Sequence, residues 1–181
     1  ATSGYFYPRS PRGERLKRYE PLADATMIVN AVLGGSMSSR LFQEVREKRG
    51  LAYTVYSYLT SYKDTGSLVI YAGVNSDNYM QSVEAIDACI KDIKNKNITE
   101  YEFRRGKEQL LSSQIFAQES TSSQMLLYGK ELIYSGNIYN FEERVKKINA
   151  VTFADVMQAI EYNFDETYKA TALVGRVDKH L

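Results

Sequence analysis

The fold is decided by one stretch of sequence, Gly34-Gly35-Ser36-Met37-Ser38-Ser39-Arg40-Leu41-Phe42-Gln43-Glu44-Val45-Arg46-Glu47-Lys48-Arg49-Gly50-Leu51-Ala52-Tyr53. A turn with two glycines leads into a charged amphipathic helix whose apolar face is Leu41, Phe42 and Val45. The helix is expected to end at Gly50, because glycine takes the left-handed cap conformation without steric cost. A strand rich in tyrosine follows at once. The stretch therefore predicts a junction between a helix and a strand.

Two strands are predicted directly after the helix. From Leu51 to Tyr62 the side chains alternate with period two, which places Tyr53, Val55, Ser57 and Leu59 on one face. A short turn at 63–66 separates this run from a second alternating run at 67–74, so the two form an antiparallel hairpin. Both faces of the first strand carry aromatic side chains, and we expect one of them to line a groove.

Helices are predicted on both sides of the hairpin. Residues 21–33 repeat apolar side chains at helical spacing before it, and a helix capped by Asn75 or Ser76 follows it. Thr99 and Glu102 form a capping box that opens a longer helical region. The remaining predictions are a break near 120–123, a helix end before Gly136, helices at 140–149 and 152–163, and a strand at 169–174. This order predicts an α+β fold, an antiparallel sheet with helices packed on one face.

Residues 1–19 are poorly patterned, and Pro8 and Pro11 lie in a segment of turn-forming residues. We predict a tail there, either disordered or introduced by cloning, with a short edge strand at Tyr5-Phe6-Tyr7 as the alternative. Residues 20–181 are predicted to form a single domain, because a chain of 181 residues with 44% hydrophobic residues can build one core.

The composition excludes several classes of function. The formal net charge of +1 gives no electrostatic reason to expect nucleic-acid binding, and no apolar run approaches the roughly 20 residues that span a bilayer. The single cysteine, Cys89, cannot form a disulfide within the chain, so we expect a reducing compartment.

The single histidine, His180, limits the chemistry further. A zinc site of His and Cys ligands needs several such side chains, and a Ser-His-Asp or Cys-His arrangement would depend on His180 alone. Gly34-Gly35-Ser36 lacks the further glycines, or the Gly-Lys-Ser/Thr ending, of a phosphate-binding loop. We therefore expect no metal or cofactor in this chain and no complete hydrolytic site.

The quoted stretch resembles the C-terminal domain of the pitrilysin or insulinase-like zinc metallopeptidases, which include the mitochondrial processing peptidases. The resemblance rests on residues 33–42 and 45–57, on Asp64-Thr65-Gly66, on Ile70-Tyr71-Ala72-Gly73, on 102–111 and on Glu119-Ser120-Thr121. It spans roughly residues 24–175 and is nearest to the bacterial processing-protease branch, which implies a location in the bacterial cytoplasm.

The resemblance implies a clamshell of two homologous halves around a chamber. The N-terminal half would hold zinc through an inverted His-x-x-Glu-His motif, whereas the C-terminal half would close the chamber without metal. That half contributes an arginine and a tyrosine, which match Arg46 and Tyr53 here. The implied partners are the N-terminal catalytic half of the same enzyme and a peptide substrate, with zinc as the cofactor of the parent enzyme.

The chemistry of peptide hydrolysis suits both residues. Attack by zinc-activated water builds negative charge on the carbonyl oxygen, which a tyrosine hydroxyl opposite the metal can stabilise. An arginine can hold the substrate main chain through its fork of donors. The alternatives are that Arg46 forms a surface ion pair with Glu47 or a neighbour of Glu44, and that Tyr53 is a core aromatic.

This sequence departs from the family pattern in two ways. It has no His-x-x-Glu-His motif, and residues 1–19 do not match the apolar strand that normally opens the domain. We therefore expect a recombinant or truncated fragment, inactive by itself, whose uncovered sheet edge could pair with a second copy as a homodimer. The alternative function is a structural or assembly subunit of the same fold without peptidase activity.

Overall fold

The structure, a computed structural model, describes residues 2–7, 22–61, 66–165 and 169–175. Four strands form one antiparallel sheet in the order β2-β3-β1-β4. Their bounds are Thr2–Tyr7 for β1, Ala52–Ser61 for β2, Gly66–Val74 for β3 and Ala170–Val174 for β4. The β2–β3 hairpin confirms the predicted pair of strands.

The prediction of an irregular tail is wrong for Thr2–Tyr7. These residues form β1, which pairs with β3 on one side and with β4 on the other, so β1 is an inner strand and not an edge strand. The pairing partners lie far along the chain, at 68–73 and 170–174, and no local pattern in the first residues shows them. Most of the predicted tail, residues 8–19, lies outside the described residues.

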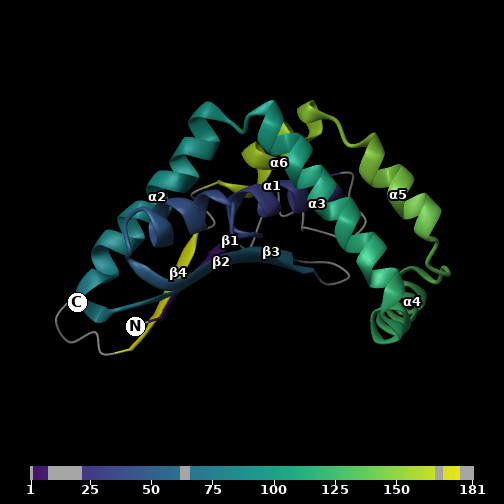
Figure 1. Cartoon of the computed structure of the whole chain (residues 1–181), viewed down its shortest axis with the longest axis horizontal. Helices are drawn as coiled ribbons and strands as arrows, with labels where there is room; N and C mark the ends of the chain where they lie inside the picture. Colours follow the sequence, from purple (N-terminus) through teal and green to yellow (C-terminus); the bar gives the residue numbers. More distant parts are fainter. Residues whose placement is uncertain (1, 8–21, 62–65, 166–168, 176–181) are drawn as a thin grey trace.

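The helices lie on one side of the sheet, as the predicted α+β fold requires (Figure 1). Their order along the chain matches the prediction, including the break at Ser120 and the helix end at Gly136, whose φ is 75°. The helical bounds are Ala23–Leu33 for α1, Phe42–Glu47 for η1, Ser76–Asn78 for η2, Tyr79–Lys96 for α2, Glu100–Glu119 for α3, Thr121–Ser135 for α4, Phe141–Ala150 for α5 and Phe153–Asn163 for α6.

The core fills the space between the sheet and helices α1, α2 and α6. Fully buried side chains come from every layer, among them Ile28 and Leu33 of α1, Ile70 of β3, Ile86 of α2 and Ile160 of α6. Helix α4 differs, because none of its residues is buried. It continues from the far end of α3 and lies beyond the sheet (Figure 1).

The glycine turn after α1 packs directly against the edge strand β2. The Ser57 amide donates a hydrogen bond to the Gly34 carbonyl oxygen at 3.1 Å. A Cβ atom on Gly34 would lie 2.5 Å from the Ser57 nitrogen, so only glycine fits this approach. The turn therefore covers part of the outer edge of β2 and fixes the start of the next helix relative to the sheet.

Candidate functional site

Arg46 and Tyr53 lie on either side of an irregular junction between η1 and β2. Residues Phe42–Glu47 form a π-helix where the sequence predicts an α-helix, and the Lys48 amide donates to the Gln43 carbonyl oxygen at 2.9 Å, five residues back. Gly50 then turns the chain with a φ of 61°, as predicted for a cap. Short π-helical segments are rare and occur frequently at functional sites.

Arg46 is exposed, and its guanidinium lies over an aromatic ring instead of a carboxylate. The Arg46 Cζ atom is 4.8 Å from the centroid of the Phe42 ring. Glu44 is already paired with Lys48, whose Nζ lies 2.5 Å from the Glu44 Oε1. Across the described part of the chain, Arg46 forms no ion pair, so the alternative of a surface pair with a glutamate finds no support there.

Tyr53 does not share a face with Val55 and Ser57, contrary to the prediction from the alternation along the strand. The register of β2 on β3 shifts between Ala52, which pairs with Val74, and Thr54, which pairs with Gly73. This β-bulge inserts Tyr53 as an extra residue, and a bulge changes the direction in which a side chain points. Ala52 stays buried, whereas Tyr53 is 75% exposed, which rules out the alternative of a core aromatic.

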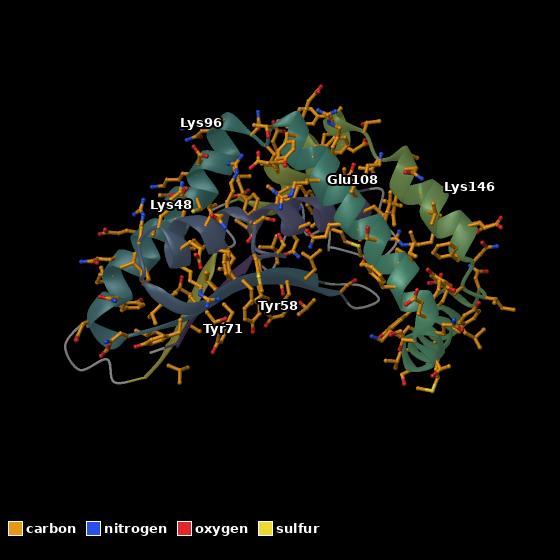
Figure 2. All side chains as sticks on the ribbon, in the orientation of Figure 1. Lys48, Tyr58, Tyr71, Lys96, Glu108 and Lys146 are labelled. Carbon is orange, nitrogen blue, oxygen red and sulfur yellow. The ribbon has the colours of Figure 1, made fainter. Side chains whose placement is uncertain are left out.

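The strands also present a row of tyrosines on the face away from the helices. Tyr56 stacks on Tyr71 of β3 with 5.1 Å between ring centroids, and the Tyr58 ring centroid lies 5.9 Å from that of Tyr56. Tyr58 and Tyr71 point away from the helical layer (Figure 2). The expectation that one face of β2 lines a groove stays a prediction. Tyr71 joins the row from β3, where it pairs with Tyr56.

The structure brings Arg46 and Tyr53 to the same junction but does not join them directly. Both side chains are exposed, and within the described ranges no hydrogen bond links them. Each therefore presents free donors to the surroundings: the guanidinium N–H groups of Arg46 and the hydroxyl of Tyr53. Such a pair can bind and polarise a ligand carbonyl, but it cannot by itself activate water.

A charged cluster beside the junction holds the glycine turn to the helices. Arg40 donates to both carboxylate oxygens of Glu102, from Nε at 2.7 Å and from Nη2 at 2.8 Å, and its Nη1 donates to Asp92 at 2.9 Å. Burial would raise the pKa of the Glu102 carboxyl, but hydrogen bonds from Arg40 and Thr99 outweigh it and lower that pKa to about 2. Because its charges satisfy one another, the cluster is structural.

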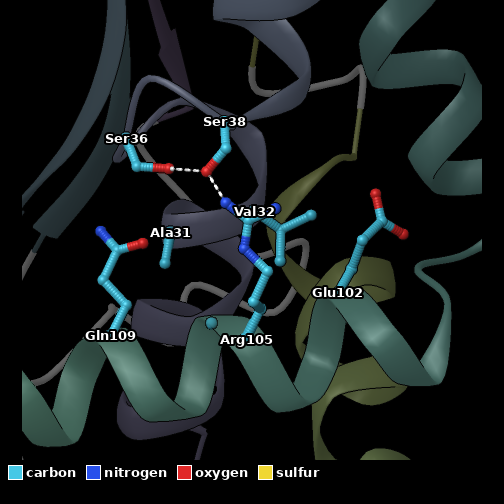
Figure 3. A pocket seen from close by; sticks show the side chains of 8 residues that line it. Ala31, Val32, Ser36, Ser38, Glu102, Arg105 and Gln109 are labelled. Atoms are coloured by element: carbon cyan, nitrogen blue, oxygen red, sulfur yellow. Dashed lines mark hydrogen bonds between the residues drawn. The ribbon is translucent and has the colours of Figure 1, made fainter.

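Two hollows lie near the turn. In the smaller one, of about 30 Å³, Arg105 donates to the Ser38 hydroxyl, which is 3.2 Å from that of Ser36 (Figure 3). The larger, of about 520 Å³, borders the Arg40 cluster and Cys89. Burial raises the pKa of the Cys89 thiol to about 11, as suits a structural cysteine. Over the described residues, no group of three His, Cys, Asp or Glu side chains could hold a metal ion.

Among the described helices, none is long and apolar enough to cross a membrane.

Comparison with known proteins connects this chain to zinc proteases. The model of the family "Peptidase M16 inactive domain" matches residues 15–110. The uncharacterized zinc protease YmxG of Bacillus subtilis (strain 168) is 42% identical over 149 residues, which are 82% of this chain and 36% of the relative. The uncharacterized zinc protease Rv2782c of Mycobacterium tuberculosis is 32% identical over 149 residues, 82% of this chain and 34% of the relative. The chain thus spans about a third of the length of these curated relatives.

Solved structures show the same fold. A protease from Helicobacter pylori superposes with a TM-score of 0.77 at 20% identity, over 94% of this chain and 40% of that one. The peptidase M16 inactive domain from Pseudomonas fluorescens gives the same TM-score, identity and coverage. The family match covers more than half of the chain, and the relatives and folds agree with it. The chain therefore belongs to the family of peptidase M16 inactive domains.

Proposed function

We propose that this chain is the non-catalytic C-terminal domain of a zinc metalloendopeptidase and that it closes the chamber in which the peptide is cleaved. The catalytic half of the same protein would supply the zinc and the activated water. This chain would supply Arg46, which binds the substrate main chain, and Tyr53, which stabilises the tetrahedral intermediate. The names of the relatives, which are called zinc proteases, support this assignment.

The observation that carries the proposal is the β-bulge at Tyr53. A regular strand would place this tyrosine in the core, where its hydroxyl could not reach a substrate. The bulge turns it outward instead, to 75% exposure, three residues after Gly50. Keeping a bulge at this point costs ladder hydrogen bonds, and bulges are frequent next to active sites.

The chemical roles follow from the donor types. A tyrosine hydroxyl is a neutral donor that can approach a carbonyl oxygen as negative charge develops on it, and losing one such donor typically costs about 10²–10³ in rate. A guanidinium presents five N–H donors in a fixed plane and remains charged at every physiological pH. Arg46 can therefore bind main-chain carbonyls before the reaction, while Tyr53 acts mainly in the transition state.

The test is Tyr53→Phe in the longer protein that contains both halves. We expect kcat for an internally quenched peptide to fall about ten-fold or more, with the melting temperature unchanged, because the exposed hydroxyl supports no packing. Tyr58→Phe is the matched control, since Tyr58 is an exposed tyrosine of the same strand. Equal activity of Tyr53→Phe and wild-type protein would remove Tyr53 from the catalytic site.

The zinc assignment has its own test. We expect the isolated chain to hold no zinc in stoichiometric amount after dialysis and to cleave no peptide, because the sequence has one histidine and no His-x-x-Glu-His motif. Elemental analysis of the purified chain measures this directly. One tightly held zinc ion per chain would contradict the proposal that the metal belongs to the other half.

A second candidate function is that of a structural or assembly subunit, which one observation favours. The end of α3 and helix α4 expose large apolar side chains, and exposed apolar patches mark sites of contact with other proteins. These side chains are Ile115, Phe116, Met125, Leu126, Leu132 and Ile133. The two candidates differ in the rest of the protein. A His-x-x-Glu-His motif in the upstream gene sequence favours the peptidase, and its absence favours the assembly subunit.

A further inference from the structure

We propose that Phe42 is a positioning residue for Arg46. The Phe42 ring holds the Arg46 guanidinium in the place from which it binds a substrate main chain. The inference rests on the proposed function, because that function gives Arg46 its substrate. It adds a residue that does not itself touch the substrate and assigns a role to the irregular helix η1.

The geometry supports this role. Phe42 and Arg46 are four residues apart on η1, a spacing at which helical side chains are neighbours. The Arg46 Cζ atom lies 4.8 Å from the Phe42 ring centroid, within the range of a cation–π contact. Phe42 is half-buried, so its ring is held by the surrounding protein, whereas Arg46 is exposed. A fixed ring thus supports a side chain that would otherwise be free to move.

The contact leaves the binding groups of Arg46 available. The N–H donors of a guanidinium lie in its plane, so a ring beneath the group contacts its face and does not use those donors. A carboxylate partner would occupy them, but Glu44 is paired with Lys48 and Arg46 has no ion pair among the residues that the structure describes. The arrangement therefore limits the motion of the arginine without consuming its hydrogen-bonding capacity.

The experiment uses the full-length protein and an unstructured, internally quenched peptide that the wild type cleaves. Phe42→Leu removes the aromatic face and keeps an apolar side chain, and Phe42→Tyr restores the face. Both changes are made alone, and Phe42→Leu is also made together with Arg46→Ala. KM and kcat are measured separately, and thermal unfolding controls for folding.

We expect Phe42→Leu to lower kcat/KM by about two- to five-fold, mainly through KM, as the strength of an exposed cation–π contact implies. Phe42→Tyr should retain wild-type values. With Arg46→Ala already present, Phe42→Leu should cause no further loss, because the residue that it positions is gone.

The proposal is overturned if Phe42→Leu leaves kcat/KM unchanged in a protein whose activity Arg46→Ala lowers. An equal loss from Phe42→Leu with and without Arg46 also overturns it, since the ring would then act only through packing. If Arg46→Ala and Tyr53→Phe both leave kcat/KM unchanged, the proposed function itself fails, so the two failures are distinguishable.

Discussion

Replacing Arg40 by methionine should destabilise the folded chain in a way that depends on pH. The Arg40 side chain is only 17% exposed and joins the glycine turn to Glu102 of α3, Asp92 of α2 and the Asn97 carbonyl oxygen. Arg40→Met keeps an unbranched apolar stem in place of the arginine stem but removes every one of these donors. The Glu102 carboxylate, which is 25% exposed, then loses its charged partner.

The size of the effect follows from the Glu102 carboxyl. Its pKa falls from 4.5 to about 2 in the folded chain, which corresponds to about 3 kcal/mol of stabilisation of the ionised form. Thr99 supplies part of this, and water screens a side chain that is partly exposed. We therefore expect Arg40→Met to lower the free energy of unfolding by about 2 kcal/mol at neutral pH, or about 4–8 °C in melting temperature.

The sign of the pH dependence is fixed by the direction of the shift. Because the folded state lowers the pKa of Glu102, the stabilisation is complete above pH 4.5 and is lost as the pH falls toward 2. Urea unfolding of wild type and Arg40→Met, followed by circular dichroism between pH 7 and pH 2, measures the difference at each pH. The destabilisation should be constant above about pH 5 and shrink below it.

Two controls make the test specific. Lys48→Met removes an exposed ion pair with Glu44 and should change stability by about 0.5 kcal/mol or less. Arg40→Met made in a Glu102→Gln background should cost less than in the wild type, because the carboxylate is already absent. A penalty for Arg40→Met that stays the same from pH 7 to pH 2 would refute the reasoning.

Three further outcomes are expected. Gly34→Ala should lower the melting temperature strongly, because the added Cβ would lie 2.5 Å from the β2 backbone. Gly129→Ala, with open space around the added Cβ, should instead raise the stability of the helix by about 1 kcal/mol. Calorimetry of the two variants measures both effects. Cys89, 6% exposed and with a thiol pKa of about 11, should react with a thiol reagent at pH 8 far more slowly in the folded chain than in urea. The chain should self-associate at high concentration through the exposed apolar side chains of α4. In analytical ultracentrifugation, the double variant Leu126→Glu, Ile133→Glu should sediment as a monomer. Equal sedimentation of the wild type and the double variant would contradict this.

Much of the fold was predictable because its signals are local. The capping box of Thr99 and Glu102 is present, with the Thr99 amide 2.7 Å from the Glu102 carboxylate, because both partners lie within one helical turn. The β2–β3 hairpin and the Gly136 cap were equally visible, since alternation and glycine placement depend on neighbouring residues. The family resemblance likewise rested on short local segments, among them 33–42 and 45–57.

The candidate residues of the site came from the family resemblance, and their geometry came only from the structure. The resemblance singled out Arg46 and Tyr53, but the period-two alternation placed the Tyr53 side chain on the wrong face of the strand. A single inserted residue reverses the face on which every side chain before it lies. Helical spacing likewise predicted an α-helix at η1 and gave no sign of the wider π-helical turn. The contact between Phe42 and Arg46 depends on side-chain conformations that the spacing permits without specifying.

From Ala23 onward, the sequence alone determined which segments are helical and which are strands, their order, and the place of the junction between helix and strand around Gly50. Periodicity and capping operate over a few residues, and those are the distances that a single sequence displays directly. The tertiary structure alone decided the rest: β1 lies between β3 and β4, Arg40 reaches acids 52 and 62 residues away, and the bulge turns Tyr53 outward. These features arise from pairing between distant segments, whose energy depends on the assembled fold and not on any one stretch.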